Sequence, residues 1–175
     1  MFLSYFSPPS EEVFSLKSKS ASGTIGSVIS VFDGNVFPNL DKAKVAIFGV
    51  NESRGTSVPS ASNNMNSFRQ EFYKLYIGPW DFEIIDLGDF KKGEKIEDTY
   101  FGITDLISNL LSIGVVPIMI GGGHDLCYAV YKAYESFGKG VNISSIDSKF
   151  DLISDDTTNI NSRNFLGYIV KESPN

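Results

Sequence analysis

The sequence predicts a three-layer α/β/α domain with a mainly parallel sheet. From Lys42 onward, short apolar runs alternate with segments in which apolar residues recur at helical spacing. Such alternation is typical of crossover units, in which a helix connects two parallel strands. Core-forming residues are also plentiful, since 42% of the 175 residues are hydrophobic and 14 Phe and 8 Tyr are among them. This length and composition suffice for one domain with a hydrophobic core.

Residues 1–41 are predicted to form an N-terminal extension packed on the main domain, which spans residues 42–175. The extension is rich in polar, small and turn-forming residues, notably Pro8-Pro9-Ser10 and residues 18–26. Within it, Val28 to Phe32 is predicted to be a short strand or part of a hairpin, because a turn signal follows directly.

The elements of the main domain follow from its hydrophobic pattern. Residues 44–50 are apolar and β-branched, which indicates a buried strand. Residues 62–75 have the spacing of a helix, and residues 82–89 are the second predicted strand. A helix over residues 96–113 ends before Gly114, a natural helix stop. The remaining predictions are a strand at 115–120, a helix at 125–137, a fourth strand at 141–146 and a helix at 164–170.

Charge and composition exclude several classes of function. The net charge of −6 repels nucleic-acid phosphates, so no nucleic-acid partner is expected. The central apolar run at 115–120 is far shorter than the roughly 20 residues of a membrane-spanning helix, and no membrane partner is expected either. The N-terminus lacks the basic segment of a signal peptide. A single cysteine, Cys127, excludes an internal disulfide and favours a reducing, cytoplasmic location.

Three of the predicted strands end in residues suited to chemistry. Ligands of open α/β sheets bind at the carboxyl ends of the strands. Here those ends carry residues 86–89, 121–125 and 147–151, which include one histidine and several carboxylates. A histidine with nearby carboxylates is a ligand set suited to a divalent ion such as Mn²⁺.

His124 follows three consecutive glycines, which allow a sharp turn at the mouth of the sheet. On this feature alone three interpretations stay open. His124 is a metal ligand, or it is an ordinary polar residue in a tight strand-to-helix loop. Alternatively, the turn binds an anion or nucleotide in a flavodoxin-like manner, because helix N-termini attract anions. Neither nucleotide-binding fingerprint is present in the sequence.

Asp147, Lys149 and Asp151 alternate, so in an extended strand they share one face. Two carboxylates on one face repel each other unless a cation lies between them, and either a metal ion or the ammonium of Lys149 could fill that place. A solvated strand end with a local Asp–Lys pair is the alternative.

Together these two segments resemble the ureohydrolase family of arginases, agmatinases and formimidoylglutamases. Members carry Gly-Gly-x-His after one strand and Asp-Ala-His-x-Asp at the end of the next. Residues 121–124 (GGGH) match the first motif, and residues 147–151 (DSKFD) lie where the second belongs. The resemblance covers roughly residues 42–153. The triple glycine is most similar to the formimidoylglutamase branch.

The resemblance implies an arginase-like fold and a hydrolase of linear C–N bonds, with a binuclear Mn²⁺ centre and a small guanidino or formimino substrate. By position, His124, Asp147 and Asp151 are its metal ligands, and no catalytic residue is assigned. Lys149 departs from the motif, because a charged ammonium has no lone pair for a metal. The later Asp-x-Asp ligands of the family are missing from the sequence. We therefore expect a fold incomplete at its C-terminal side and Mn²⁺ that is absent or incompletely bound.

Two hypotheses of function follow. In the first, the 175 residues are a fragment of a longer Mn²⁺ hydrolase and are inactive alone. In the second, the chain is a non-catalytic binding or assembly domain in which Lys149 neutralises the two aspartates. An interrupted sheet exposes an edge, which makes a homo-oligomer possible in either case.

Other candidate centres are assigned structural roles. Cys127 and His124 are close enough in sequence for a thiol mechanism, but a cysteine on the apolar side of a helix is usually core. Asp86 and Asp89 are expected to act as turn or cap residues. Arg54 is expected in a surface ion pair rather than on an anionic ligand.

Overall fold

The computed structural model describes residues 3–56, 65–79, 81–138, 140–153 and 159–172. The chain forms two compact units. The first contains the sheet, and the second contains all three residues of the predicted metal site. The segments of the first unit are Met1–Asn51, Ser62–Lys91 and Leu110–Gly121, and those of the second are Glu52–Ala61, Lys92–Asn109 and Gly122–Asn175.

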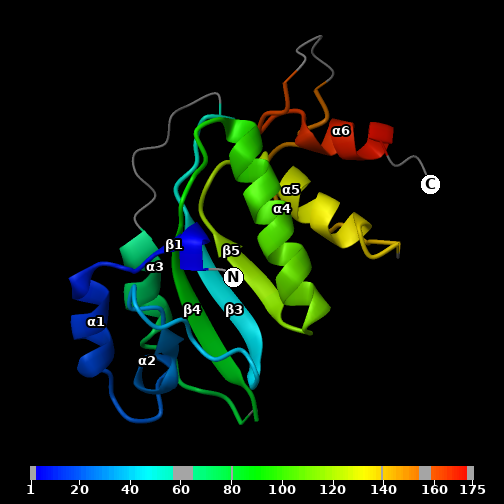
Figure 1. Ribbon diagram of the computed structural model, residues 1–175. Helices are drawn as coiled ribbons and strands as arrows, with labels where there is room; N and C mark the ends of the chain where they lie inside the picture. Colours follow the sequence, from blue (N-terminus) through cyan, green and yellow to red (C-terminus); the bar gives the residue numbers. More distant parts are fainter. Residues whose placement is uncertain (1–2, 57–64, 80, 139, 154–158, 173–175) are drawn as a thin grey trace. The chain divides into compact units, whose positions relative to one another are not determined.

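The sheet of the first unit is mainly parallel, as the sequence predicts (Figure 1). Its long strands are β3 (Ala43–Val50), β4 (Glu83–Phe90) and β5 (Val116–Ile120), and β3 pairs in parallel with both others. Two short strands also pair with β4: β2 (Ser30–Val31) runs parallel to it and β1 (Phe6–Ser7) antiparallel. The strands predicted from the first three apolar runs are confirmed, as is a short strand before the turn at residues 33–35.

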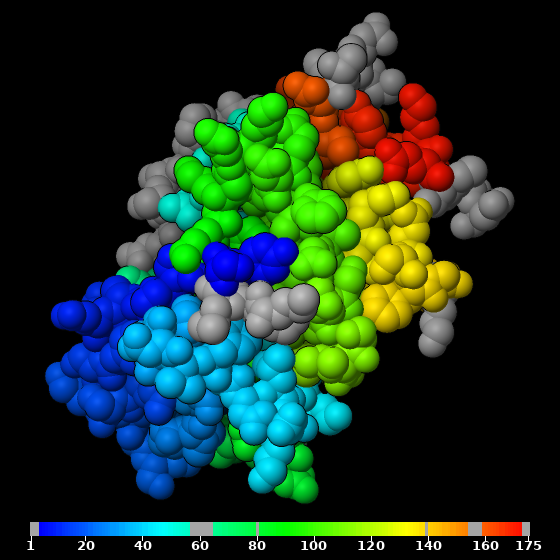
Figure 2. Space-filling model, viewed as in Figure 1, coloured from blue at the N-terminus to red at the C-terminus, as the bar shows by residue number. Residues whose placement is uncertain are grey.

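One face of this sheet is covered by helices of the same unit. These are α1 (Glu11–Ser18), α2 (Ile25–Val28) and α3 (Met65–Phe72), which lie together on one side of the strands (Figure 1). In the chain, the 3-10 helix η1 (Leu3–Tyr5) precedes them. Val13 of α1, Ile25 of α2 and the residues directly after α2 and α3, Ile29 and Tyr73, form a buried cluster with Ile47 of β3. The part of the predicted helix at residues 62–64 lies outside the described residues. Residues 3–41 thus contribute two strands, β1 and β2, and two helices, α1 and α2, to the first unit. Figure 2 shows this N-terminal part in blue.

A buried ion-pair network joins α3 to β4 within the first unit. The Arg69 guanidinium donates to both carboxylate oxygens of Asp86, at 2.7 and 3.1 Å, and to Asp89 Oδ1 at 2.7 Å. The Tyr73 hydroxyl donates to Asp86 Oδ2 at 2.9 Å, and the Gly88 N–H donates to Asp86 Oδ1 at 2.8 Å. Burial acts to lower the pKa of Arg69, but the hydrogen bonds and charges of the two aspartates raise it overall. The turn or cap role expected for Asp86 is wrong, because the residue lies within β4, where its carboxylate anchors α3 through Arg69.

The helices predicted for the rest of the chain are confirmed. They are α4 (Ile96–Ser112), whose last residues belong to the first unit, α5 (Leu126–Glu135) and α6 (Phe165–Glu172). Within the second unit, Thr104 Oγ1 of α4 donates to the carbonyl of Ala129 in α5 at 3.0 Å. None of the helices in the described residues is long and apolar enough to cross a membrane.

The fourth strand predicted at residues 141–146 is wrong. The segment belongs to no strand of the described structure, and Val141, Ile143 and Ile146 are exposed. An apolar run becomes a strand only where a neighbouring strand offers unpaired backbone groups. Among the described residues, β5 pairs with β3 alone and residues 141–146 pair with nothing. The pattern identified strand-forming side chains but contained no information about a pairing partner.

Candidate metal centre

The turn before His124 requires its glycines. Gly121 and Gly122 have φ values of 85° and 79°, in the left-handed region that side-chain-bearing residues rarely adopt. Gly123 is required for a different reason, since a Cβ at this position would lie 2.1 Å from Asp125 Oδ1. The Gly123 N–H donates to the Glu52 carbonyl at 2.8 Å, which fixes the turn within the second unit. His124 therefore follows a sharp glycine turn, as predicted.

His124 lies between the two predicted aspartates. Its Nδ1 is 2.9 Å from Asp147 Oδ2 and 2.9 Å from Asp151 Oδ2. The imidazole packs on the buried ring of Phe165 with centroids 4.6 Å apart. The side chain of His124 remains 35% exposed, whereas that of Asp151 is only 8% exposed. The cluster is thus open to solvent on the histidine side and closed behind Asp151.

The two aspartates meet His124 through a bent backbone rather than an extended strand. Asp151 has a φ of 48°, in the left-handed region, which no extended strand contains. Asp147 Oδ1 accepts a hydrogen bond from the backbone N–H of Lys149 at 3.2 Å. Burial acts to raise the pKa of Asp147, but backbone hydrogen bonds from Lys149 and Ser148 and the charge of His124 lower it overall. Asp147 and Asp151 lie close together, as expected. The extended strand from which their proximity was predicted does not form.

The donors of this cluster fit a single hard divalent ion. One ligand atom each from His124, Asp147 and Asp151 lie within 4.8 Å of one another. Adjacent donors on an octahedral ion with bonds of about 2.1 Å are roughly 3.0 Å apart, close to the 2.9 Å between His124 Nδ1 and each carboxylate. One imidazole and two carboxylates are donors that Mn²⁺ accepts.

Lys149 does not take the place of the cation in this arrangement. It is exposed, and among the described residues its ammonium forms no ion pair with Asp147 or Asp151. Its side chain instead lines a surface hollow of about 420 Å³, together with Phe150, Asp151, Leu152, Ile153 and Arg163. The positive group that faces both carboxylates here is the imidazole of His124 when it is protonated.

Sequence reasoning missed the residues that support His124. Asp125 is completely buried, and its carboxylate accepts hydrogen bonds from the hydroxyls of Tyr100 and Ser162 at 2.6 and 2.8 Å. Phe165 was also missed. The only signal for Asp125 was its position directly after the turn, because hydrophobic periodicity does not identify a buried polar contact.

The other candidate centres have structural roles. The Arg54 guanidinium forms an ion pair, as expected, but its partner Glu52 is buried, at 1% exposed, rather than at the surface. Burial acts to raise the pKa of Glu52, but hydrogen bonds and charge from Arg54 lower it overall. Burial, followed by the charges of Asp125 and Asp151, raises the pKa of the Cys127 thiol, which disfavours a thiolate nucleophile.

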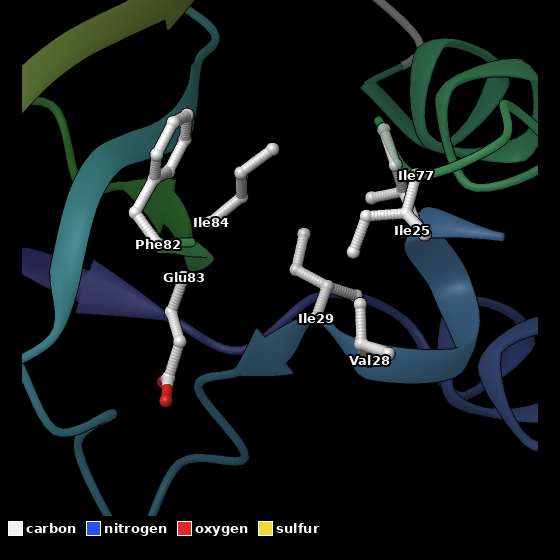
Figure 3. A pocket seen from close by; sticks show the side chains of 7 residues that line it. All are labelled: Ile25, Val28, Ile29, Ile77, Phe82, Glu83 and Ile84. Atoms are coloured by element: carbon white, nitrogen blue, oxygen red, sulfur yellow. The ribbon is translucent and has the colours of Figure 1, made fainter. Parts of the chain in front are cut away.

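A second hollow lies in the first unit, but its described lining lacks the polar side chains that a catalytic or ligand-binding site requires. It has a volume of about 130 Å³ and is lined almost entirely by apolar side chains, which come from α2 and from the start of β4 and the residues before it (Figure 3). Glu83 is its single charged residue, and Figure 3 shows that carboxylate directed away from the isoleucines. A substrate would find no convergent polar groups there.

The family of the chain follows from its sequence. A sequence model of the arginase family matches residues 43–173. The chain belongs to the arginase family. Among curated relatives, the formimidoylglutamase of Streptococcus gordonii is 24% identical over 152 residues, which cover 80% of this chain and 45% of the relative.

Solved structures of the family share this fold. The formimidoylglutamase of Bacillus subtilis matches with a TM-score of 0.70 and 20% identity, over 89% of this chain and 50% of that one. A Trypanosoma cruzi formiminoglutamase with Mn²⁺ matches with a TM-score of 0.68 and 19% identity, over 77% of this chain and 50% of that one. The predicted class, a three-layer α/β/α architecture with a mainly parallel sheet, is confirmed. The chain spans about half or less of the length of these relatives.

Proposed function

We propose that the protein acts in the hydrolysis of linear C–N bonds in formimino or guanidino compounds, with Mn²⁺ held by His124, Asp147 and Asp151. The observation that supports this function best is the convergence of one nitrogen and two oxygen donors within 4.8 Å. When bound, Mn²⁺ supplies a Lewis acid and lowers the pKa of water, so that a nucleophile is available at neutral pH.

The residues around the ion have separate tasks in this proposal. Asp147 and Asp151 provide the negative charge that attracts a divalent cation, and His124 provides a neutral nitrogen when deprotonated. Since the side chain of His124 is 35% exposed, a small substrate can approach from its side. The formimidoylglutamases among the relatives favour a formimino substrate over a guanidino one. The single cysteine supports a reducing, cytoplasmic setting.

A non-catalytic function is the second candidate, and the donor count favours it for the chain alone. Among the described residues, the cluster contains three donor side chains, and Lys149 occupies the position at which family members carry a second histidine. A binuclear centre needs donors beyond these three. We therefore propose, as the second candidate, that the 175 residues form a binding or assembly domain without turnover.

The two candidates are separated by measuring turnover and metal content together. The chain is incubated with MnCl₂ and either a formimino amino acid or agmatine, and release of formamide or urea is followed. No release is expected from the 175-residue chain, and Mn²⁺-dependent release would show that the three-donor site suffices for catalysis. Metal analysis of the wild type and of Lys149→His provides the second comparison. If only Lys149→His retains Mn²⁺, the metal-dependent function fails and the non-catalytic one gains.

A further inference from the structure

Asp125 is a buried carboxylate for which the proposed function has no chemical use. Its exposed fraction is 0%, and its two oxygens are occupied by hydroxyl donors from separate segments. Tyr100 of α4 donates to Oδ2 at 2.6 Å, and Ser162, shortly before α6, donates to Oδ1 at 2.8 Å. Burial, followed by its contact with Asp125, raises the pKa of Tyr100, so the phenol remains a proton donor. Burying a carboxyl group is costly unless its oxygens are hydrogen-bonded, and both oxygens of Asp125 are.

The Asp125 side chain leaves no room for a Cβ at two neighbouring glycines. A Cβ at Gly123 would lie 2.1 Å from Asp125 Oδ1, and a Cβ at Gly55 would lie 2.2 Å from Asp125 Oδ2. Both glycines therefore leave space that the Asp125 side chain fills. The loop at Gly55 is tied to the same point, because the Ser162 N–H donates to the Gly55 carbonyl at 2.8 Å. Three segments of the second unit thus converge on one carboxylate.

This convergence fixes His124 from two sides. The backbone carbonyls of His124 and Asp125 accept hydrogen bonds from the first turn of α5, from the N–H groups of Cys127 at 3.1 Å and Tyr128 at 3.0 Å, so both residues are tied to the start of that helix. On the opposite side, the contact with Ser162 anchors the segment that leads into Phe165. The Phe165 ring packs on the imidazole at 4.6 Å. Asp125 directly follows His124 in the chain and is also hydrogen-bonded to the segment that leads into Phe165.

We propose that Asp125 is a positioning residue for the metal site: by holding Tyr100 and Ser162 it keeps the His124 imidazole between Asp147 and Asp151. The proposal rests on the proposed function where it concerns metal affinity. The positioning itself is a property of the metal-free chain. Loss of groups that orient a metal ligand typically lowers metal affinity by about 10- to 100-fold.

The test compares Asp125→Asn and Tyr100→Phe with a matched control, Thr104→Val. The control removes a different α4 hydroxyl, whose hydrogen bond reaches the Ala129 carbonyl in α5 rather than the turn. Mn²⁺ affinity is measured by electron paramagnetic resonance of free Mn²⁺, and melting temperature is measured on the metal-free chain. Asp125→Asn and Tyr100→Phe are expected to weaken Mn²⁺ binding by at least about 10-fold, and Thr104→Val is expected to leave it unchanged. Equal affinity losses in Tyr100→Phe and Thr104→Val would overturn the proposal.

A metal-free measurement separates this proposal from the proposed function. His124 is the single histidine of the sequence, so its imidazole resonances in a ¹H–¹⁵N spectrum are assigned without further variants. At fixed pH, Asp125→Asn and Tyr100→Phe should move them toward the values of free imidazole, and Thr104→Val should not. If this holds while the wild type binds no Mn²⁺, the metal-dependent function fails and the positioning role stands. If the resonances do not move, the positioning role fails even where Mn²⁺ binds.

Discussion

Replacing Arg69 with methionine is expected to destabilise the first unit strongly. The guanidinium is 1% exposed and Asp86 is 0% exposed, so the substitution leaves a buried carboxylate without its cation. Among the described residues, Asp86 then keeps the hydrogen bonds from the Tyr73 hydroxyl at 2.9 Å and from the Gly88 N–H at 2.8 Å. Removing one partner of a buried ion pair costs about 3–5 kcal/mol, and we expect a loss in that range in the free energy of unfolding measured by urea titration.

Two further variants assign that loss to the buried charge. Asp89 is the second partner of Arg69, and its side chain is 38% exposed. Asp89→Asn should therefore lower the free energy of unfolding by less than about 1 kcal/mol. The double variant Arg69→Met with Asp86→Asn removes the orphaned charge and should recover part of the stability lost in Arg69→Met alone. The reasoning is refuted if Arg69→Met costs no more than Asp89→Asn, or if the double variant recovers nothing.

Two other predictions concern the second unit. The pKa of Glu52 is lowered from its ordinary value of 4.5 by Arg54, so its contribution to stability is present above that pH and is lost as the pH falls through the folded-state pKa. Glu52→Gln should therefore flatten the acid side of the pH–melting-temperature profile, and an unchanged profile would contradict this assignment. Gly123→Ala places a Cβ 2.1 Å from Asp125 and should lower the melting temperature, whereas Gly140→Ala, with nothing within 4 Å, should not. Equal melting temperatures for the two alanine variants would show that the turn can relax.

The sequence predicted those parts of the fold that depend on local pattern. The apolar run at 44–50 and the stop at Gly114 located β3 and the end of α4, because burial and backbone conformation there depend on neighbouring residues in the chain. Residues 141–146, in which β-branched and polar residues are mixed, form no strand, since strand formation also depends on a partner. Pattern reasoning contains no information about pairing.

The sequence predicted which residues form the candidate site, but not the backbone conformation and the contacts that hold them in place. Resemblance to the family motifs identified His124, Asp147 and Asp151, and the structure brings them together. The left-handed backbone at Asp151 was not foreseen, because an aspartate adopts it only when surrounding contacts impose it. The contacts of Asp125 with Tyr100 and Ser162 join residues distant in sequence, and no spacing rule identifies such contacts.

His124, Asp147 and Asp151 are proposed to bind Mn²⁺, and a titration of the metal-free chain followed by electron paramagnetic resonance tests this binding. The wild type is expected to bind one Mn²⁺ per chain. His124→Ala and Asp151→Asn are expected to abolish this binding, while Asp105→Asn, a carboxylate of α4 outside the cluster, should retain it. Mn²⁺ binding that survives both cluster substitutions, or no binding by the wild type, would contradict the claim.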